Sequence, residues 1–281
     1  MTLLRRSSRT RLSLVGGLAA VLLAATACGG SSGDSTTPGG SEKQAGGRTL
    51  AQVEKAGVIT VATEGTYRPF TYHENGSGEL TGYDVEVMKA IGEQLGVDVK
   101  FEETQWDAIF AGLDAGRFDA IANQVSITPE RQAAYDFSTP YTVSPGVIVV
   151  NKGDDSISSF ADLKGKTTAQ SLTSNWYELA KKSGADVENV EGWAQAVTLL
   201  KQGRVDATIN DELTYLDYEH TEGDTGLAIA ATTDDEAHNA VAFRPGSDSL
   251  IKAVDKALVT LRKDGTLARI SEKYFGEDVS Q

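Results

Sequence analysis

The sequence predicts an α/β protein built from two similar lobes, each a mainly parallel sheet flanked by helices. Strand-like and helix-like segments alternate from residue 58 onward, which is typical of parallel strands connected by helices. A unit of helix, tight turn and strand occurs twice, as WDAIFAGLDAGRFDAIANQ at 106–124 and WAQAVTLLKQGRVDATIND at 193–211. Both copies end in polar residues, and ligands of open α/β sheets bind outside the carboxyl ends of strands. We therefore expect one cleft lined from both lobes.

The first 27 residues are expected to be an export signal. Four arginines precede the apolar run LSLVGGLAAVLLAATA at 12–27, which is shorter than the about 20 apolar residues of a usual membrane span. An uncleaved membrane anchor is the alternative. Cys28 is the only cysteine and follows the small residues 25–27, so we expect it to carry a lipid, as in a bacterial lipoprotein. Ordinary cleavage at the same A-x-A-like site is the other interpretation.

Residues 28–47 are expected to comprise the lipid-bearing cysteine and a flexible tether. The tether is predicted because glycine, serine and threonine dominate there and almost nothing can be buried. Together with a lipid on Cys28, this tether predicts a domain held at the outer face of a bacterial cell membrane. We expect the domain to be a monomer. The chain carries 26 Lys and Arg against 40 Asp and Glu, a net charge of −14. Such a surface argues against nucleic acid as a partner, and against membrane contact other than through the lipid.

The first elements of the domain follow from periodicity and from turn residues. In order, the sequence predicts a strand at 58–63, a loop at 64–70, a hairpin at 72–80, a helix at 84–95 and a strand at 97–101. The hairpin turns at Asn75-Gly76. For the helix, Asp84 is the expected N-cap, and Gly96 stands where the helix should stop.

The repeated unit predicts its own geometry. One helix face carries Trp106, Ile109, Phe110 and Leu113 in the first copy, and Trp193, Val197 and Leu200 in the second. Gly116 and Gly203 stand where a helix ends in the left-handed conformation. We interpret Trp106 and Trp193 mainly as structural residues. A single sheet can also reuse such a unit, so the repeat by itself leaves one sheet as an alternative to two lobes.

The stretch NQVSITPER at 123–131 predicts a receptor for a carboxylate. Thr128 is a natural N-cap and Pro129 suits the first helical position, so free backbone N–H groups should face an anion. Arg131 can hold a carboxylate with two parallel hydrogen bonds, and Ser126 adds a hydroxyl. The alternative is an arginine on a solvated helix face.

Other polar and aromatic residues have both a structural and a ligand-binding interpretation. Asp211 could cap the helix predicted at 212–218, or could accept hydrogen bonds from an ammonium group. Tyr67 and Phe70 could be core residues or an aromatic wall of the site. The helix start at Ser174-Asn175 could donate hydrogen bonds to a ligand or only cap the helix.

Signals for catalysis and for cofactors are weak. His73, His220 and His238 lie far apart in the sequence, without the spacing of a metal site. No phosphate loop and no dinucleotide-binding glycine pattern occurs. The groups near Arg131 suit recognition of a zwitterion rather than its transformation. We therefore expect a binding protein, not an enzyme, with no metal and no cofactor.

Five stretches together carry a family resemblance: EGTYRPFTY, ELTGYDVEV, the W-D-x-x-x-x-x-L-x-x-G-R-x-D-A unit, SITPERQAAYDFSTPY and RKDGTLARISEKYFG. Through them the sequence from Thr49 to Gly276 resembles the family 3 solute-binding proteins of polar amino-acid ABC importers. EGTYRPF and the run from NQVSITPER to YDFSTPY are closest to the cystine-binding branch. Thr173 stands where many members have Gly, and Trp176 where Tyr is common.

The resemblance implies the type II fold of periplasmic binding proteins, with lobe 1 formed by residues 48–143 and 243–281, lobe 2 by residues 144–242, and a two-strand hinge between them. It implies capture of an amino acid, L-cystine first of all, and its delivery to an ABC permease. Another polar amino acid is the alternative ligand. The rival functions are a dehydratase or lytic transglycosylase on the same scaffold, with Glu64 or Asp211 as general acid, and a sensor for a membrane receptor.

The resemblance also implies which residues contact the ligand. Those expected around the α-carboxylate are Arg131, Ser126, Ser174 and Asn175. Asp211 is expected to bind the α-ammonium group. The ligand side chain is expected to meet Tyr67, Phe70 and Glu64, and the remaining lobe 1 contacts are Asn123, Gln124 and Trp106.

Overall fold

The computed structural model describes residues 46–280; the predicted export signal, the predicted lipidation site Cys28 and all but the last two residues of the predicted tether lie outside them. Its longer strands are β1 (Val58–Thr63), β5 (Asp98–Glu103), β6 (Ala120–Ser126), β8 (Thr142–Asn151), β9 (Thr167–Gln170), β10 (Asp186–Asn189), β11 (Thr208–Asp211) and β12 (Leu227–Phe243). The short strands are β2 (Thr66–Tyr67), β3 (Thr71–His73), β4 (Leu80–Thr81) and β7 (Asp136–Phe137). The α-helices are α1 (Leu50–Ala56), α2 (Tyr83–Leu95), α3 (Trp106–Asp114), α4 (Pro129–Gln132), α5 (Asn175–Lys182), α6 (Gly192–Lys201), α7 (Glu212–Glu222), α8 (Asp248–Lys263) and α9 (Thr266–Phe275). The 3-10 helices are η1 (Glu74–Gly76) and η2 (Phe160–Leu163).

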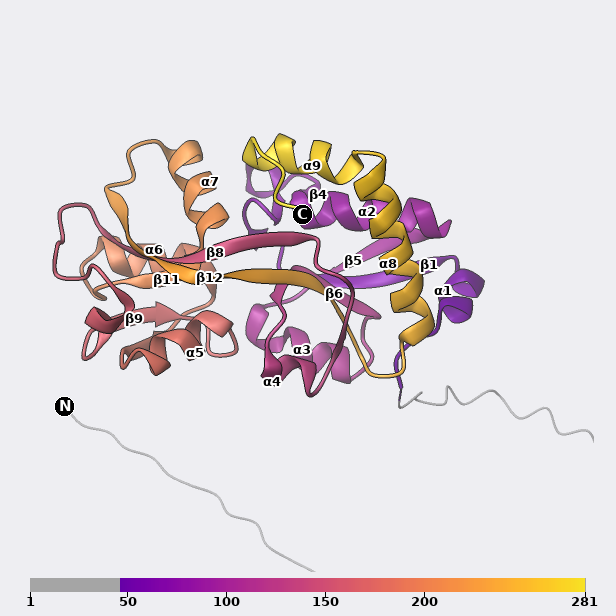
Figure 1. Ribbon diagram of the computed structural model, residues 1–281, viewed down its shortest axis with the longest axis horizontal. Helices are drawn as coiled ribbons and strands as arrows, with labels where there is room; N and C mark the ends of the chain where they lie inside the picture. The colour runs from indigo at the N-terminus through magenta and orange to yellow at the C-terminus, as the bar shows by residue number, and fades with distance from the viewer. Residues whose placement is uncertain (1–45, 281) are drawn as a thin grey trace, which may run out of the picture. The chain divides into compact units, whose positions relative to one another are not determined.

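Two long antiparallel strands, β8 and β12, run through both lobes and connect them (Figure 1). They belong to a seven-stranded sheet in the order β11-β8-β12-β6-β1-β5, with β7 paired to β12. The register of β12 shifts twice against β8, at residues 229–231 and 232–236. Since no other strands cross between the lobes in residues 46–280, β8 and β12 are the predicted two-strand hinge.

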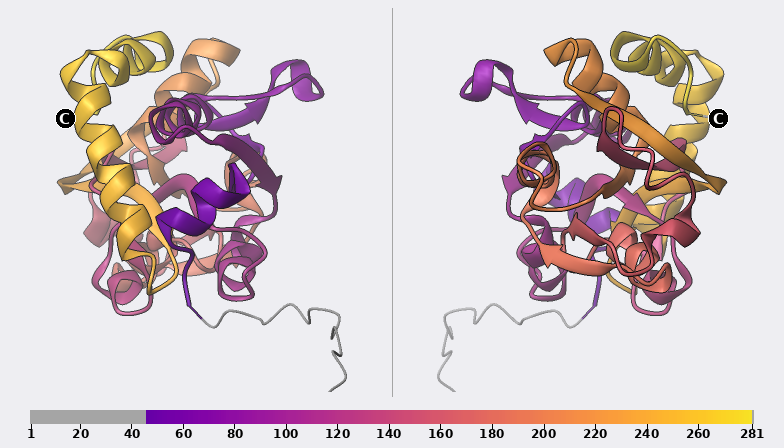
Figure 2. Two further views of the ribbon diagram at one scale, coloured as in Figure 1. Left: turned by 90° about the vertical axis from the view of Figure 1, so that its right-hand side faces the viewer. Right: turned by 90° about the vertical axis from the view of Figure 1, so that its left-hand side faces the viewer.

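In lobe 1, the parallel strands β5, β1 and β6 have helices on both faces (Figures 1 and 2). Successive side chains of a strand point to opposite faces. Ala120 and Ala122 of β6 accordingly join the hydrophobic cluster covered by α2, α8 and α9, while Ile121 and Val125 join the cluster covered by α3. Because α8 and α9 follow β12, this lobe is assembled from two separate segments of the chain.

In lobe 2, the same alternation along β8 divides the core. Val147 and Val149 pack with residues of α6 and α7, whereas Ile148 and Val150 pack with residues of α5. The strands β9 and β10 are parallel, and a parallel bridge joins Thr168 to Ala207 just before β11. All four hydrophobic clusters belong to the unit Gln44–Gln281, so this unit has a complete core of its own.

The repeated unit lies once in each lobe, which confirms the two-lobe prediction. The first copy forms α3 and β6, and the second forms α6 and β11. Gly116 and Gly203 have φ of +67° and +66°, the left-handed values predicted after each helix. The predicted hairpin is also present, because β3 and β4 pair antiparallel around η1.

One predicted cap was wrong. The N-cap of α2 is Gly82, and Asp84 lies inside the first turn with its side chain buried. The predicted strand at 97–101 is observed as β5, and the helix predicted at 212–218 as α7, which continues to Glu222. The lobe boundaries predicted near residues 143 and 243 fall within β8 and at the end of β12, which continue without a break, so they remain a prediction.

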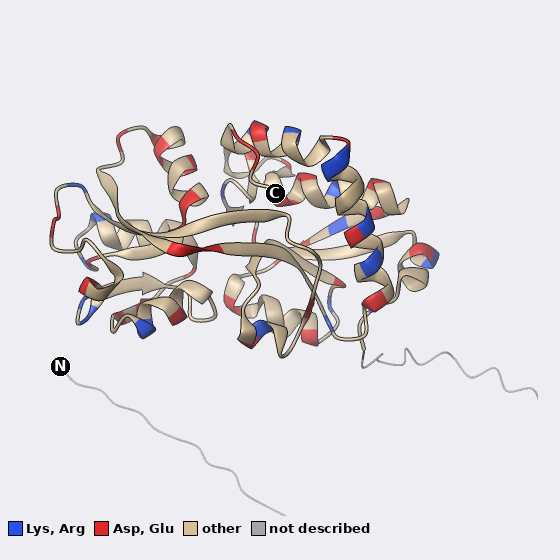
Figure 3. Cartoon of the chain, in the orientation of Figure 1, with Lys and Arg blue, Asp and Glu red and all other residues tan. Residues whose placement is uncertain are grey.

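Charged side chains are distributed unevenly over the described residues. Lys and Arg line the outward side of α8, and acidic residues mark the middle of β12 (Figure 3). Buried charged residues are few: Asp84, Asp119, Arg131 and Asp211. Between residues 46 and 280, no helix is both long enough and apolar enough to span a membrane.

Candidate functional site

A cavity lies between the two lobes, where strands end and helices begin. Its empty volume, which includes space open to solvent, is about 470 Å³. From lobe 1 it is lined by Glu64, Tyr67, Trp106, Asn123 and Gln124. From lobe 2 it is lined by Gln170, Ser171, Ser174, Asn175, Trp176, Gly192, Trp193 and Asn210. Three of the lining residues begin helices, because α3 starts at Trp106, α5 at Asn175 and α6 at Gly192, and helix starts carry free N–H groups.

Glu64 and Asn123 form the acidic part of the cavity. The Asn123 Nδ2 donates to Glu64 Oε2 at 2.6 Å, and Asn123 Oδ1 accepts from the backbone N–H of Glu64 at 2.8 Å. The pKa of Glu64 is raised to about 7, chiefly by burial; the nearby carboxylates of Glu191 and Asp107 contribute to this rise, and the hydrogen bond from Asn123 opposes it. None of the ion pairs among residues 46–280 includes Glu64. This carboxylate is therefore available to a cation.

Four polar atoms at the cavity wall are buried without a hydrogen-bond partner within residues 46–280. Three are donors, namely Nε1 of Trp106, Nε1 of Trp193 and Nε2 of Gln170, and the fourth is the acceptor Oε1 of Gln124. A buried polar group without a partner costs about 1–3 kcal/mol. Five further atoms of this kind belong to described residues outside the wall, but a ligand with both acceptors and a donor could satisfy the four at the wall.

Arg131 is buried beside the cavity rather than in its wall. Its Nη1 donates to the carbonyl of Ser126 at 2.9 Å and its Nη2 to the carbonyl of Thr173, in the opposite lobe, at 3.2 Å. The guanidinium lies 5.3 Å from the ring centres of both Trp106 and Phe110. Burial lowers the pKa of Arg131 to about 10, so the side chain remains charged at neutral pH. No carboxylate among the described residues forms an ion pair with it.

The local structure around Arg131 matches its sequence only in part. Thr128 is the N-cap of α4, accepting from the backbone N–H of Arg131, and Pro129 is the first helical residue, as predicted. The helix itself has only four residues, so the anion-binding N-terminus expected there is a single turn. The Ser126 hydroxyl points elsewhere, donating to Asn239 of β12 at 2.8 Å.

Asp211 lies behind the cavity. Its Oδ1 accepts from the backbone N–H of Leu213 at 3.0 Å, which makes it the N-cap of α7, and its Oδ2 accepts from the Ser144 hydroxyl at 2.5 Å. Burial raises the pKa of Asp211 to about 6. The preceding residue, Asn210, faces the cavity instead, and its Oδ1 accepts from the Tyr67 hydroxyl at 2.8 Å.

Gln124 connects the cavity to a buried carboxylate that sequence reasoning missed. Its φ is +50°, a left-handed kink at the end of β6. Asp84 holds this kink, since Oδ2 accepts from the backbone N–H of Gln124 at 2.8 Å and Oδ1 from its Nε2 at 2.6 Å. Burial raises the pKa of Asp84 to about 7. Asp84 therefore turns the Gln124 side chain so that only its oxygen remains free.

Of the predicted site residues, the structure brings seven together in the cavity wall: Glu64, Tyr67, Trp106, Asn123, Gln124, Ser174 and Asn175. Ser126, Arg131 and Asp211 lie outside the wall, and Phe70 is fully buried in the core, with its ring centre 5.8 Å from that of Phe275. Their ligand contacts remain predictions.

Sequence reasoning did not assign several wall residues of lobe 2. Two of them could have been found from the internal repeat, because Trp193 and Asn210 occupy the positions of Trp106 and Asn123 in the second copy. Gln170, Ser171 and Gly192 give no comparable signal. No group of three His, Cys, Asp or Glu side chains arranged to hold a metal is found in residues 46–280.

Comparison with known proteins gives one consistent result. The model of the family described as bacterial extracellular solute-binding proteins, family 3, matches residues 59–277. The L-cystine-binding protein TcyA of Bacillus subtilis (strain 168) is 52% identical over 235 residues, which cover 84% of this chain and 87% of that protein. These matches confirm the family predicted from the sequence motifs.

Two solved structures extend the comparison to the fold. The L-cystine solute receptor of Neisseria gonorrhoeae, in its unliganded open conformation, is 48% identical with a TM-score of 0.57, over 83% of this chain and 99% of its own. An ancestral arginine-binding protein bound to arginine is 38% identical with a TM-score of 0.73, over 78% of this chain and 99% of its own. Despite the lower identity, the present structure is more similar in shape to the arginine-bound protein.

Proposed function

Because the chain belongs to family 3 of the bacterial extracellular solute-binding proteins, we propose that its cavity captures a free amino acid, L-cystine in the first place. The observation that carries this proposal is the set of unpartnered groups at one cavity. The N–H donors of Trp106, Trp193 and Gln170 suit a carboxylate, while Glu64 and the Gln124 oxygen suit an ammonium group. An α-amino acid carries both charges on one carbon, so it can satisfy both sets at once.

The predicted roles of Arg131 and Asp211 form part of this proposal. The Arg131 guanidinium lies against Trp106, a wall residue, and its two hydrogen bonds in the structure leave three of its five N–H donors for a carboxylate. Asp211 is one residue from Asn210 in the wall, so its carboxylate supports the ammonium end of the site from behind.

L-cystine is proposed because the cystine-binding proteins of Bacillus subtilis and Neisseria gonorrhoeae share about half of their residues with this chain. The cavity chemistry agrees, since cystine is a zwitterion at each end and the site offers both signs. Glu64 and Trp193 also line a neighbouring groove, so a ligand longer than one amino acid has room to extend.

Delivery to the membrane permease of an ABC importer follows from the two lobes. Closing about β8 and β12 changes the outer surface formed jointly by both lobes, and a permease can distinguish that surface from the open one. We further propose that residues 1–27 direct export. A lipid on Cys28, through the tether to residue 47, then holds the domain at the outer face of the cell membrane.

The proposal is tested with three disulfides that differ in their charged end groups, added to the unit from residue 44 onward after unfolding and refolding to remove carried-over ligand. They are L-cystine, cystamine, which lacks both carboxylates, and 3,3′-dithiodipropionate, which lacks both amino groups. A ligand at about 100 times its dissociation constant adds roughly 2.7 kcal/mol to the stability of the native state. L-cystine should therefore raise the melting temperature, and the other two should not.

The same assay with arginine and the other common amino acids separates substrate from function. A shift with arginine or another amino acid, but not with L-cystine, keeps amino-acid binding and replaces the substrate. Equal shifts with all three disulfides contradict recognition of the zwitterion. No shift with any amino acid contradicts the proposed function as a whole.

A further inference from the structure

Besides the cavity, the two lobes touch each other directly at its rim. Asp107, the second residue of α3 in lobe 1, accepts two hydrogen bonds from Thr173 in lobe 2. The Thr173 backbone N–H donates to Asp107 Oδ1 at 3.0 Å and the Thr173 hydroxyl to the same oxygen at 2.8 Å. The Thr173 carbonyl in turn accepts from Arg131 at 3.2 Å, so one residue of lobe 2 is bound by two of lobe 1.

Neither Asp107 nor Thr173 lines the cavity, although each is adjacent in sequence to a residue that does. Trp106 and Ser174 face the cavity, while the side chains of Asp107 and Thr173 reach the rim, where Thr173 is exposed. Asp107 and Thr173 therefore connect the two lobes outside the cavity wall.

Apart from those made by Thr173, the contacts between the lobes either involve residues of the cavity wall or contribute little. Tyr67 donates to Asn210 at 2.8 Å and accepts from Thr214 at 3.1 Å, but Tyr67 and Asn210 are both wall residues. Arg68 and Asp217 form an ion pair at 3.4 Å with the arginine largely exposed, a kind of pair that contributes little. Among the hydrogen bonds between the lobes in residues 46–280, only the Asp107–Thr173 contact joins a charged acceptor to two donors away from the wall.

We propose that Asp107 and Thr173 form a latch that stabilises the closed arrangement of the lobes and thereby sets binding strength without taking part in ligand selection. An interaction that exists only when the lobes are closed strengthens every ligand that requires closure by the same factor. Residues in the wall, in contrast, contribute differently to different ligands. The proposal rests on the proposed capture of a ligand between the lobes, and it adds residues that control affinity from outside the cavity.

The test uses Asp107→Ala, which removes the acceptor of both hydrogen bonds, and Thr173→Val, which removes the hydroxyl but keeps the backbone donor. Asp162→Ala is the matched control, because Asp162 also accepts from the N–H and hydroxyl of a serine and from a second hydroxyl, all within lobe 2. Because the Asp107 carboxylate also raises the pKa of Glu64, dissociation constants are measured at pH 8, where Glu64 is mostly ionised with or without Asp107. They are obtained by titration calorimetry for L-cystine and for any other amino acid that shifts the melting temperature.

Asp107→Ala should weaken each ligand about tenfold and Thr173→Val about threefold, chiefly through faster release, with Asp162→Ala unchanged. The double variant Asp107→Ala/Thr173→Val should lose no more than Asp107→Ala alone, since both act on one contact. Losses that differ between ligands would make these residues part of the ligand site, and unchanged affinity would remove the latch altogether.

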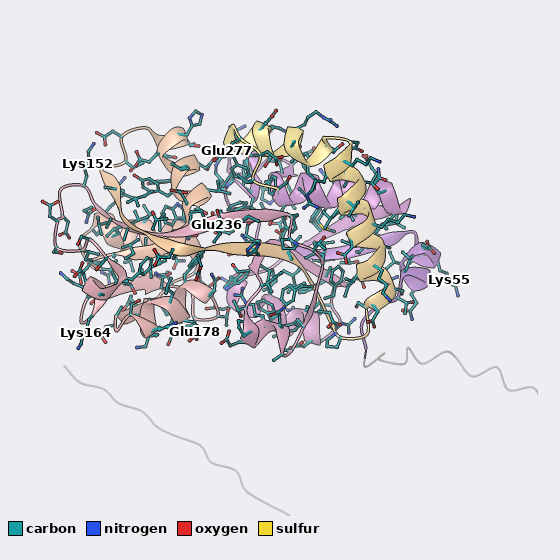
Figure 4. The ribbon with its side chains drawn as sticks, in the orientation of Figure 1. Lys55, Lys152, Lys164, Glu178, Glu236 and Glu277 are labelled. Carbon is teal, nitrogen blue, oxygen red and sulfur yellow. The ribbon has the colours of Figure 1, made fainter. Side chains whose placement is uncertain are left out.

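A second readout needs no ligand, so it separates failure of the latch from failure of the proposed function. The unit from residue 44 onward contains no cysteine, because the single cysteine of the chain is Cys28. Dyes can therefore be placed at Ala133→Cys beside α4 and at Glu178→Cys on α5, both exposed and in opposite lobes; Figure 4 marks Glu178. Energy transfer between them should fall in Asp107→Ala and Thr173→Val relative to Asp162→Ala. Identical transfer in all three variants contradicts the latch, whether or not any amino acid binds.

Discussion

Asn123 holds Glu64 at two points, donating to its carboxylate at 2.6 Å while accepting from its backbone N–H at 2.8 Å. The carboxylate is thus fixed in direction at the end of β1, although its pKa is raised to about 7, chiefly by burial. A carboxyl group in this state is half-protonated near neutral pH. A cationic ligand group should therefore bind Glu64 in its ionised form and lower its pKa.

Binding should therefore depend on pH through Glu64. An ammonium group binds the ionised form, so affinity should fall by up to about tenfold per pH unit as pH decreases below 7. Calorimetry with L-cystine between pH 5.5 and 7.5, in two buffers of different ionisation enthalpy, should also detect protons released on binding. Glu64→Gln should bind more weakly and lose this pH dependence; a variant that keeps it assigns the titration to another group.

Stability without ligand should decrease as pH rises from about 4 to 7. The pKa values of Glu64, Asp84 and Asp211 are raised to about 7, 7 and 6, mainly by burial, from 4.5, 3.8 and 3.8. Between the unfolded and folded pKa values the native state holds more protons than the unfolded state, so the free energy of unfolding falls with pH. Urea unfolding from pH 4 to 8 measures the slope.

Glu64→Gln serves as the control for this stability prediction, because an amide imitates the protonated carboxyl group. It should flatten the slope and be more stable than the unchanged protein at pH 8 by on the order of 1 kcal/mol. A slope of the opposite sign in the unchanged protein would mean that the ionised carboxylates are stabilised in the fold.

The indole N–H groups of Trp106 and Trp193 should contribute to affinity but not to folding. Phenylalanine keeps most of the ring and removes the unpartnered donor, so each Trp→Phe variant should bind L-cystine about three- to tenfold more weakly. The free energy of unfolding without ligand should stay unchanged or rise, since a buried donor without a partner is lost. Unaltered affinity together with lower stability would make both tryptophans core residues only.

Arg131→Ala should weaken L-cystine by roughly 30-fold or more, because removing one partner of a desolvated charge pair costs ~2–5 kcal/mol. Arg131→Lys should not restore the affinity, since an ammonium group cannot replace a two-pronged guanidinium. Calorimetry on both variants gives the comparison. An Arg131→Ala protein that binds as the unchanged protein does would exclude Arg131 from carboxylate recognition.

Cys28→Ala should release the exported protein from the membrane fraction, because the lipid is its proposed anchor. The measurement is the distribution of the protein between membrane and soluble fractions of expressing cells, together with the mass of the N-terminal peptide. Continued membrane association of Cys28→Ala would favour the uncleaved apolar segment at residues 12–27 as the anchor.

The fold could be predicted from the sequence because its signals are local and repeated. Gly116 and Gly203 end the two related helices in the left-handed conformation, as expected from residues a few positions apart. Asp84 could not be assigned in this way. As a cap it would act on its own helix, but its actual partner is Gln124, 40 residues away, at a backbone kink that sequence does not reveal.

Only part of the site could be predicted, because some of its residues are positioned by contacts between distant parts of the chain. Glu64 follows β1, and Asn123 and Gln124 lie near the carboxyl end of the neighbouring parallel strand β6, so period and topology were enough to bring them together. Arg131 and Asp211 have the chemistry of ligand partners, but tertiary contacts with Thr173 and Ser144 decide where their charges lie. Such contacts cannot be obtained from spacing along one chain.

The passage of β8 and β12 through both lobes also means that lobe 1 is completed by residues near the end of the described chain. Lobe 2 is continuous in sequence and has both of its cores once β12 has been added. Lobe 1 must wait for α8 and α9, since Leu250, Val254 and Val279 belong to the same cluster as Ile59 of β1. During export, residues 46–143 would thus stay without their final core until about residue 279 has crossed the membrane. We therefore expect the binding cleft to be completed only after α8 and α9 have been added to lobe 1.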